Sequence, residues 1–208
     1  MAKLYFRYGA MNCGKTALLL QAVHNYEARG MKVLVLKPIV DSKGGKTIVS
    51  RIGLKREVDH LIKNTEDMFK YLSKNIINIS CIFIDEAQFL KRKQVDDLLR
   101  VVVTYDIPII CYGLRTDFKT NGFEGSTRLL ELAHSVEEMK TICHCGKKAT
   151  FNARFINDKF TIEGDQVAID GKNKVTYDSV CPRCYYKMLD EYNNCLLYTS
   201  PSPRDRQK

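Results

Sequence analysis

The segment that most constrains this chain is residues 9–16, Gly-Ala-Met-Asn-Cys-Gly-Lys-Thr, which has the pattern G-x-x-x-x-G-K-[ST]. It directly follows the apolar residues 4–6 and precedes the helix-like run 17–20, Ala-Leu-Leu-Leu. A phosphate-binding loop needs a strand before it, glycines that turn its backbone amides inward, and a helix N-terminus behind it. This context predicts a nucleoside triphosphate site rather than an accidental Gly-rich turn.

The residues of this loop have separate predicted roles. The backbone amides of residues 11–16 are expected to surround the phosphates. Lys15 is expected to reach the β- and γ-phosphates, and the Thr16 hydroxyl to ligate Mg²⁺. Cys13 is interpreted as a small filler of the loop rather than a reactive thiol. The residues predicted here to bind ATP are Gly9, Ala10, Met11, Asn12, Cys13, Gly14, Lys15 and Thr16.

The first half of the chain alternates short apolar runs with helix-like segments. Continuous apolar strands between helices favour a parallel sheet that is covered on both faces. The predicted fold class is therefore α/β, with a P-loop NTPase core of the RecA-like kind. We expect strands at 3–7, 32–37, 81–84 and 107–112, helices at 15–29, 66–74 and 95–105, and a mobile loop at 41–53.

The character of the sequence changes after residue 138. Paired cysteines there enclose a Gly-, Asp- and Lys-rich segment with short alternating strands near 149–155 and 167–169. We therefore predict a kinase-type core at 1–138 and a small zinc-ribbon or lasso domain at 139–194 that carries a closing loop.

Two acids, Asp85 and Glu86, directly follow the buried strand at 81–84. The carboxyl end of such a strand lies at the sheet edge where the phosphate loop also opens. Asp85 fits the carboxylate associated with Mg²⁺, which leaves Glu86 free to accept a proton from an attacking hydroxyl or to orient it. Many ATPases use an acid at this place to activate water, so the pair alone leaves kinase and hydrolase open.

The cysteines Cys143, Cys145, Cys181 and Cys184 form two close pairs separated by a hairpin-like insert. Two such pairs suit a tetrahedral structural zinc site, and four thiolates leave no open position for catalysis. His144 is an alternative ligand, interpreted instead as a solvent-facing neighbour.

Charge and hydropathy limit the class of partner and compartment. The net charge of +9 is dispersed along the chain rather than clustered, so we do not expect nucleic acid as a partner. No apolar run approaches the roughly 20 residues that span a membrane, and the N-terminus lacks the layout of a signal peptide. We expect a cytoplasmic protein with no membrane partner.

Residues 195–208 differ from the rest of the chain in composition, being uncharged at first and then rich in Ser and Pro. They resemble an in-frame translation of sequencing-adapter DNA. We expect them to be a non-native or disordered tail that follows a helix already ended.

Taken together, these features resemble the type II thymidine kinase family. The resemblance rests on the phosphate loop, on residues 85–89 (Asp-Glu-Ala-Gln-Phe), on residues 113–118 (Gly-Leu-Arg-Thr-Asp-Phe), and on paired cysteines enclosing a loop. These motifs occur in the family's order and spacing across roughly residues 1–194. The resemblance implies transfer of the γ-phosphate of ATP to the 5′-hydroxyl of thymidine or deoxyuridine, which yields thymidine monophosphate in nucleotide salvage for DNA synthesis.

The resemblance also implies roles for individual residues. Glu86 would be the proton acceptor, and residues 166–177 would close over the base. Arg51, or alternatively Lys43, would supply the basic group near the reacting phosphate. Members are commonly homotetramers inhibited by the triphosphate end product. The second ATP-contacting segment would be Asp85, Glu86, Ala87 and Gln88, and the base pocket Met11, Phe89, Leu114, Phe118, Phe123, Ile169 and Tyr177.

Two other readings compete with a nucleoside kinase. A nucleic-acid-dependent ATPase with a zinc ribbon would use the same loop and acids, and a regulatory nucleotide-binding module would lack turnover. The single small core and the absence of a long basic stripe disfavour the first. The intact Lys15, Thr16, Asp85 and Glu86 disfavour the second.

Overall fold

The computed structural model describes the backbone of residues 1–39, 45–166 and 174–199 and the side chains up to residue 194. Its central feature is a six-stranded sheet in the order β5-β2-β6-β7-β1-β8, in which every neighbouring pair is parallel. The six strands are β1 (Leu4–Tyr8), β2 (Lys32–Pro38), β5 (His60–Ile62), β6 (Ile79–Ile84), β7 (Ile109–Gly113) and β8 (Ser135–Glu138).

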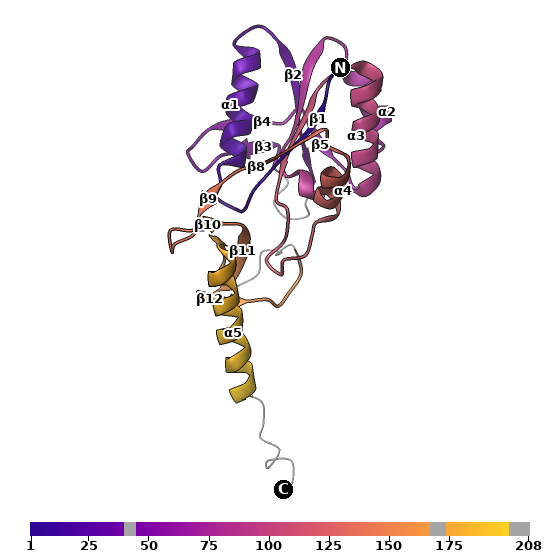
Figure 1. The fold of residues 1–208 in the computed structure, drawn as a ribbon. Coiled ribbons are helices and arrows are strands. Elements are labelled where there is room, and N and C mark those ends of the chain that lie inside the picture. The colour runs from indigo at the N-terminus through magenta and orange to yellow at the C-terminus, as the bar shows by residue number, and fades with distance from the viewer. Residues whose placement is uncertain (40–44, 167–173, 200–208) are drawn as a thin grey trace.

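Helices cover both faces of this sheet (Figure 1). Successive side chains of a strand point to opposite faces, and β6 shows the result. Its Cys81 and Phe83 lie in one buried apolar cluster with residues of α1, whereas Ile82 and Ile84 lie in a second cluster with residues of α2, α3 and α4. The predicted doubly covered parallel sheet is confirmed. The helices are α1 (Lys15–Glu27), α2 (Met68–Asn75), α3 (Arg92–Tyr105) and α4 (Glu124–Leu132).

The segment predicted as a mobile loop contains a strand instead. β3 (Thr47–Val49) pairs antiparallel with β4 (Lys55–Glu57), so the loop prediction for 41–53 is wrong at 47–49, whereas residues 45–46 and 50–53 lie outside regular strands and helices. The physical reason is that Ile48 is only 2% exposed and packs into the cluster beneath α1. Residues 40–44 lie outside the described part of the chain.

A second, smaller region follows β8. Its main sheet is three-stranded and antiparallel, in the order β12-β11-β13, and it carries a separate apolar cluster that includes Ala153, Val180 and Tyr185. The strand predicted near 149–155 is confirmed as β11, while 167–169 lies outside the described residues. The elements are β9 (Thr141–Ile142), β10 (Lys148–Ala149), β11 (Phe151–Ile156), β12 (Lys159–Thr161), β13 (Val175–Val180) and α5 (Pro182–Thr199).

Helix α5 projects away from the large sheet (Figure 1) and continues to Thr199. The expectation that this helix has ended before residue 195 is therefore wrong. No glycine or proline interrupts the chain between Pro182 and Pro201, so nothing in the sequence stops the helix earlier. None of the helices in the described part of the chain is long and apolar enough to cross a membrane.

Candidate active site

The phosphate loop joins β1 to α1 and has the conformation that its glycines allow. Asn12 and Gly14 both adopt positive φ, 64° and 81°. A Cβ atom on Gly9 would lie 2.5 Å from the Cys13 sulfur and 2.7 Å from the Met139 carbonyl oxygen, so this position needs glycine. The Cys13 side chain thus packs back onto the start of the loop, as expected of a filler. The Lys15 ammonium donates to the Ala10 carbonyl at 2.8 Å.

A cavity of about 330 Å³ opens above this loop. It brings together side chains that are far apart in sequence: Arg51 from the β3–β4 connection, Glu86 after β6, and Leu114 after β7. The full lining is Met11, Asn12, Gly14, Lys15, Thr16, Ala17, Val49, Ser50, Arg51, Ile52, Glu86 and Leu114. The structure therefore places the candidate base, the candidate phosphate-stabilising arginine and the phosphate loop around one space.

Asp85 lies at the buried end of β6, beside the first turn of α1. Its side chain is 4% exposed, and Thr16 Oγ1 donates to Asp85 Oδ2 at 3.4 Å. Burial raises the pKa of Asp85, and the neighbouring Glu86 carboxylate raises it further. A buried carboxyl group of this kind is stabilised as an anion when a cation is close. The hydroxyl and carboxylate oxygens are the donors that Mg²⁺ prefers, so this pair fits the predicted site.

The backbone conformation of Glu86 aims its side chain into the cavity. Glu86 has a φ of 53° and is followed by the short 3₁₀ helix η1 (Ala87–Phe89). Gln88 Nε2 donates to Glu86 Oε2, and Gln88 Oε1 accepts from the Leu114 amide at 3.1 Å. Gln88 thus connects the candidate base to the loop after β7.

Ala87 and Gln88 are both buried. Ala87 is 0% and Gln88 2% exposed. A Cβ on Gly113 would lie 2.8 Å from Gln88 Oε1, which shows how closely the carboxamide is held. That these two residues contact the nucleotide stays a prediction. The bridging role of Gln88 had no signal in the sequence beyond its place in the 85–89 motif.

The predicted aromatic base pocket is only partly gathered around the cavity. Met11 and Leu114 line it. Phe89 and Phe123 instead pack edge to face with ring centroids 5.6 Å apart, and Phe118 is 1% exposed. The Tyr177 ring lies 6.4 Å from that of Phe118. Ile169 lies outside the described residues.

Arg154 of β11 was not predicted as part of this region. Its guanidinium lies 4.7 Å from the Phe118 ring centroid and donates to the Asp165 carbonyl at 3.0 Å. Nearby, Gln166 Nε2 donates to Asp117 Oδ2 at 3.1 Å. These contacts hold the start of the predicted closing loop against residues 113–118. An isolated arginine in a strand carries no sequence signal for such a role.

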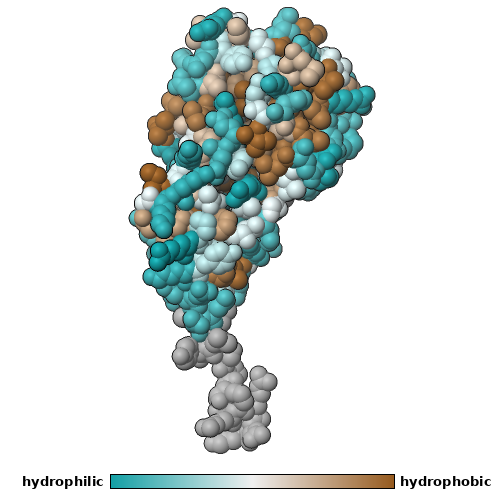
Figure 2. Space-filling model, viewed as in Figure 1, coloured by the Kyte–Doolittle hydropathy of each residue, from teal (hydrophilic) through white to brown (hydrophobic). Residues whose placement is uncertain are grey.

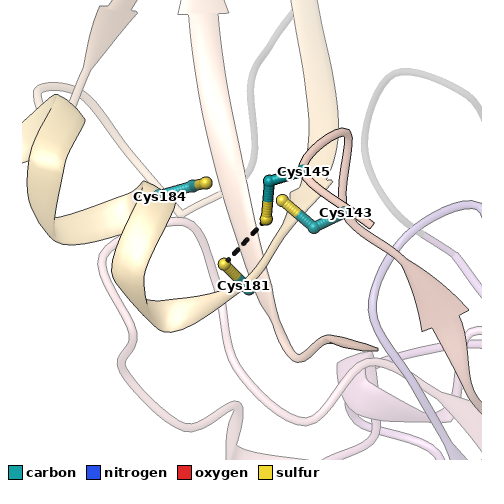
Figure 3. A group of neighbouring side chains, drawn as sticks. All are labelled: Cys143, Cys145, Cys181 and Cys184. Atoms are coloured by element: carbon teal, nitrogen blue, oxygen red, sulfur yellow. Dashed lines mark hydrogen bonds between the residues drawn. The ribbon is translucent and has the colours of Figure 1, made fainter. Parts of the chain in front are cut away.

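The four predicted cysteines converge (Figure 3). Their sulfur atoms all lie within 4.8 Å of one another. Cys143 and Cys145 lie in the turn between β9 and β10, where Gly146 has a φ of 82° and its amide donates to the Cys143 carbonyl at 2.8 Å. Cys181 lies between β13 and α5, and Cys184 lies in the first turn of α5. The two ends of the intervening segment are thus brought to one point.

The chemistry of this cluster fits a divalent cation. All four side chains are free thiols, and zinc–sulfur bonds of about 2.3 Å in a tetrahedron place sulfurs about 3.8 Å apart. The backbone amide of Cys184 lowers the pKa of Cys181 to about 7, whereas hydrogen bonding with the neighbouring sulfurs, Cys145 first, raises the pKa of Cys184. A bound dication would favour the thiolate form of all four cysteines. His144 is exposed and is not one of the four, and its Nδ1 lies 3.7 Å from the Cys143 sulfur.

Comparison with known proteins gives the family. The family model described as thymidine kinase matches residues 2–185. This chain belongs to the thymidine kinase family. It is 48% identical over 185 residues to a thymidine kinase of Enterobacteria phage T4, covering 87% of this chain and 94% of that protein. It is 44% identical over 188 residues to a thymidine kinase of Streptococcus pyogenes serotype M3, covering 89% of this chain and 98% of that protein.

A solved structure of a DNA replication initiation factor overlaps the chain only loosely. Its TM-score is 0.38 with 16% sequence identity, covering 67% of this chain and 40% of that chain. Thymidine kinase family membership favours a nucleoside kinase over the nucleic-acid-dependent ATPase. The family also implies ATP as the phosphate donor.

Proposed function

We propose that this chain is an ATP-dependent thymidine kinase that transfers the γ-phosphoryl group of ATP to the 5′-hydroxyl of thymidine or deoxyuridine. With thymidine as the acceptor, the reaction yields ADP and thymidine monophosphate, a product of nucleotide salvage. The observation that carries the proposal is the cavity in which Glu86 faces the phosphate loop, with Met11 and Leu114 beside it. If ATP and the nucleoside both bind in this cavity, the acceptor hydroxyl and the γ-phosphate lie next to each other and next to the Glu86 carboxylate.

Phosphoryl transfer depends mainly on positioning and charge neutralisation. The amides of the loop and Lys15 hold the phosphates of ATP. Arg51 lines the same cavity, which supports it as the basic group that stabilises the transferring phosphate. Lys43, the alternative, lies outside the described residues.

Glu86 accepts the proton of the 5′-hydroxyl as the new phosphate bond forms. The hydrogen bond from Gln88 holds one oxygen of its carboxylate in place. Thr16 and Asp85 are the residues that hold Mg²⁺, which when bound neutralises charge on the phosphates. The buried setting of Asp85 supports this assignment.

The nucleoside base lies toward Met11 and Leu114, with residues 166–177 closing over it. The hydrogen bond from Gln166 to Asp117 supports this proposal, because it attaches the first residue of the closing loop to residues 113–118. Phe89, Phe118, Phe123, Ile169 and Tyr177 complete the proposed pocket. In this arrangement the phenylalanines do not line the cavity directly and instead pack behind the residues that do.

Structural zinc held by Cys143, Cys145, Cys181 and Cys184 ties the ends of the closing segment. The convergence of the four sulfurs supports it. We place the boundary between a core at 1–138 and a zinc domain at 139–194, since the second region has its own apolar cluster.

The active form is proposed to be a cytoplasmic homotetramer. Figure 2 shows apolar side chains gathered over the region of β8 and α4, and the smaller region below is mostly hydrophilic. Val136 on β8 is 43% and Leu130 on α4 is 40% exposed. Apolar side chains gathered on one face support association between copies through that face.

The Glu86→Gln variant tests the proposed chemistry. Removal of a general base costs about 10²- to 10⁴-fold in rate, so thymidine-dependent kcat should fall by that factor. The KM values for ATP and thymidine should change little, because the amide keeps the shape and the bond to Gln88. Glu57→Gln, at an exposed carboxylate of β4, serves as the control. Turnover by Glu86→Gln close to that of the unmutated protein would remove Glu86 as the base.

A further inference from the structure

Two side chains of the smaller region reach the phosphate loop together. Asn152 of β11 and Ser179 of β13 are directly opposite each other in the register of the two strands. Cross-strand partners of this kind project from the same face of a sheet. Both residues are only 3% exposed. They form a buried polar pair in a region whose remaining buried residues are mostly apolar.

Both members of this pair bind the backbone of Met11. Asn152 Oδ1 accepts from the Met11 amide at 2.8 Å, and the Ser179 hydroxyl donates to the Met11 carbonyl. Asn152 Nδ2 also donates to the Thr116 carbonyl at 3.0 Å. We call Asn152 and Ser179 the Met11 clamp. In this structure the Met11 amide donates to Asn152 rather than pointing freely into the loop. That the amides from Asn12 onward surround the phosphates stays a prediction.

The clamp controls the orientation of the next amide. The Met11 carbonyl and the Asn12 N–H belong to one planar trans peptide and point in opposite directions. A bond that fixes the carbonyl therefore fixes the direction of the Asn12 N–H. This matters because Asn12 has a φ of 64°, a conformation that residues other than glycine adopt infrequently. The loop needs an external contact to hold its first phosphate-facing amide.

We propose that Asn152 and Ser179 are positioning residues that hold the first amide of the phosphate loop in its ATP-binding direction. The inference rests on the proposed function in that the loop binds the ATP phosphates. If the proposal holds, the smaller region contributes to the binding of ATP as well as closing over the nucleoside. Ser179 stands between Tyr177, proposed to contact the base, and Cys181, proposed to bind zinc. Residues 177–181 are thus proposed to serve all three tasks.

The Ser179→Ala variant tests the clamp. A lost hydrogen bond of ordinary strength corresponds to about a fivefold change in an equilibrium constant. The KM for ATP and the calorimetric Kd for a non-hydrolysable ATP analogue should each rise about fivefold, while the KM for thymidine, for which Met11 is proposed to form one wall of the pocket, should rise by a smaller factor. Zinc content should be unchanged, and the melting temperature should fall only modestly, because one buried carbonyl loses its donor. Asn152→Ala should show the same split between the two substrates.

Two further variants separate positioning from general damage. Ser179→Thr restores a hydroxyl and should recover ATP affinity. Ser73→Ala removes a hydroxyl that donates to the Lys70 carbonyl on α2 and should leave both KM values unchanged. Unchanged ATP affinity in both clamp variants would overturn the proposal. So would an equal loss of ATP and thymidine affinity together with loss of zinc, because that result indicates loosening of the whole region.

The binding measurement also keeps this proposal separate from the proposed function. If the unmutated protein does not phosphorylate thymidine, the proposed function fails. The ATP-analogue affinities of the unmutated, Ser179→Ala and Ser179→Thr proteins decide the clamp in either case.

Discussion

The large sheet and the smaller cysteine-bearing region are held together by different means. The sheet lies between two extensive apolar clusters in which β6 contributes Cys81 and Phe83 to one face and Ile82 and Ile84 to the other. The smaller region has one limited cluster, and two of its buried members are the cysteines Cys143 and Cys181. Burial of apolar surface can stabilise the first region by itself. The second has a smaller cluster, and we propose that a metal bound by its four cysteines supplies the remaining stability.

The two regions also differ in what they contribute to the site. The proposed reacting groups all belong to the large sheet region: Lys15 and Thr16 begin α1, and Asp85 and Glu86 directly follow β6. The smaller region contributes contacts that hold other groups in place, through Asn152 and Ser179 on Met11 and through Arg154 on Phe118. The comparison therefore separates chemistry from positioning, and each of the following variants addresses one side of it.

The largest effect is expected for Cys181→Ser. Loss of one sulfur should reduce bound zinc from about one per chain to near zero and raise the KM for thymidine at least about tenfold. Hydrogen exchange should accelerate in β11 and β13 and stay slow in β6, because the sheet retains its own core. His144→Ala, at the exposed neighbour, is the control. Unchanged metal content and exchange in Cys181→Ser would contradict the zinc assignment, and equal acceleration in β6 would contradict the independence of the two regions.

An intermediate effect is expected for Gly125→Ala in the first turn of α4. A Cβ atom there would lie 2.6 Å from the Ala87 carbonyl oxygen and 2.7 Å from that of Leu90. Those backbone atoms belong to the segment that follows Glu86, so it must shift. We expect about 1–3 kcal/mol of destabilisation in urea unfolding and a lower kcat with zinc content unchanged.

Gly45→Ala is the matched control for this variant, because a Cβ atom at Gly45 has no neighbour within 4 Å. If Gly125→Ala unfolds and turns over like Gly45→Ala, α4 does not position Glu86.

The smallest effect is expected for Arg154→Lys, at the contact between the regions. Lysine keeps the charge but loses the flat guanidinium over Phe118 and the bond to the Asp165 carbonyl. The KM for thymidine should rise about threefold, with kcat and the KM for ATP nearly unchanged. Arg183→Lys, at an exposed position of α5, is the control. A change confined to the KM for ATP would mean that Arg154 does not hold the thymidine side of the site.

The sequence predicted the large region better than the smaller one, for physical reasons. The phosphate loop, the apolar strand before Asp85 and the paired cysteines are local patterns, and each dictates its own geometry. The edge strands β5 and β8 and the β3–β4 hairpin were missed because they are short and their pairing depends on distant partners. Ile48 becomes a buried residue only when it meets the cluster beneath α1.

The site was predictable to the same limited extent. Lys15, Thr16, Asp85, Glu86 and the four cysteines lie where their motifs place them. Asn152 and Arg154 were missed because they contact residues far away in the sequence, Met11 and Phe118 respectively. The sequence of a strand does not indicate such long-range contacts. The positions of Phe118 and Phe123 in the interior also follow from packing rather than from the glycine-rich pattern around them.

The central claim is that thymidine accepts the γ-phosphate. The most direct test incubates the unmutated protein with γ-labelled ATP and Mg²⁺, adding thymidine, deoxyuridine, other nucleosides or single-stranded DNA in parallel. The account predicts label in the 5′-monophosphate of thymidine, in equal amount to the ADP formed, and no stimulation by DNA. ATP hydrolysis that rises with single-stranded DNA and does not respond to thymidine would contradict it.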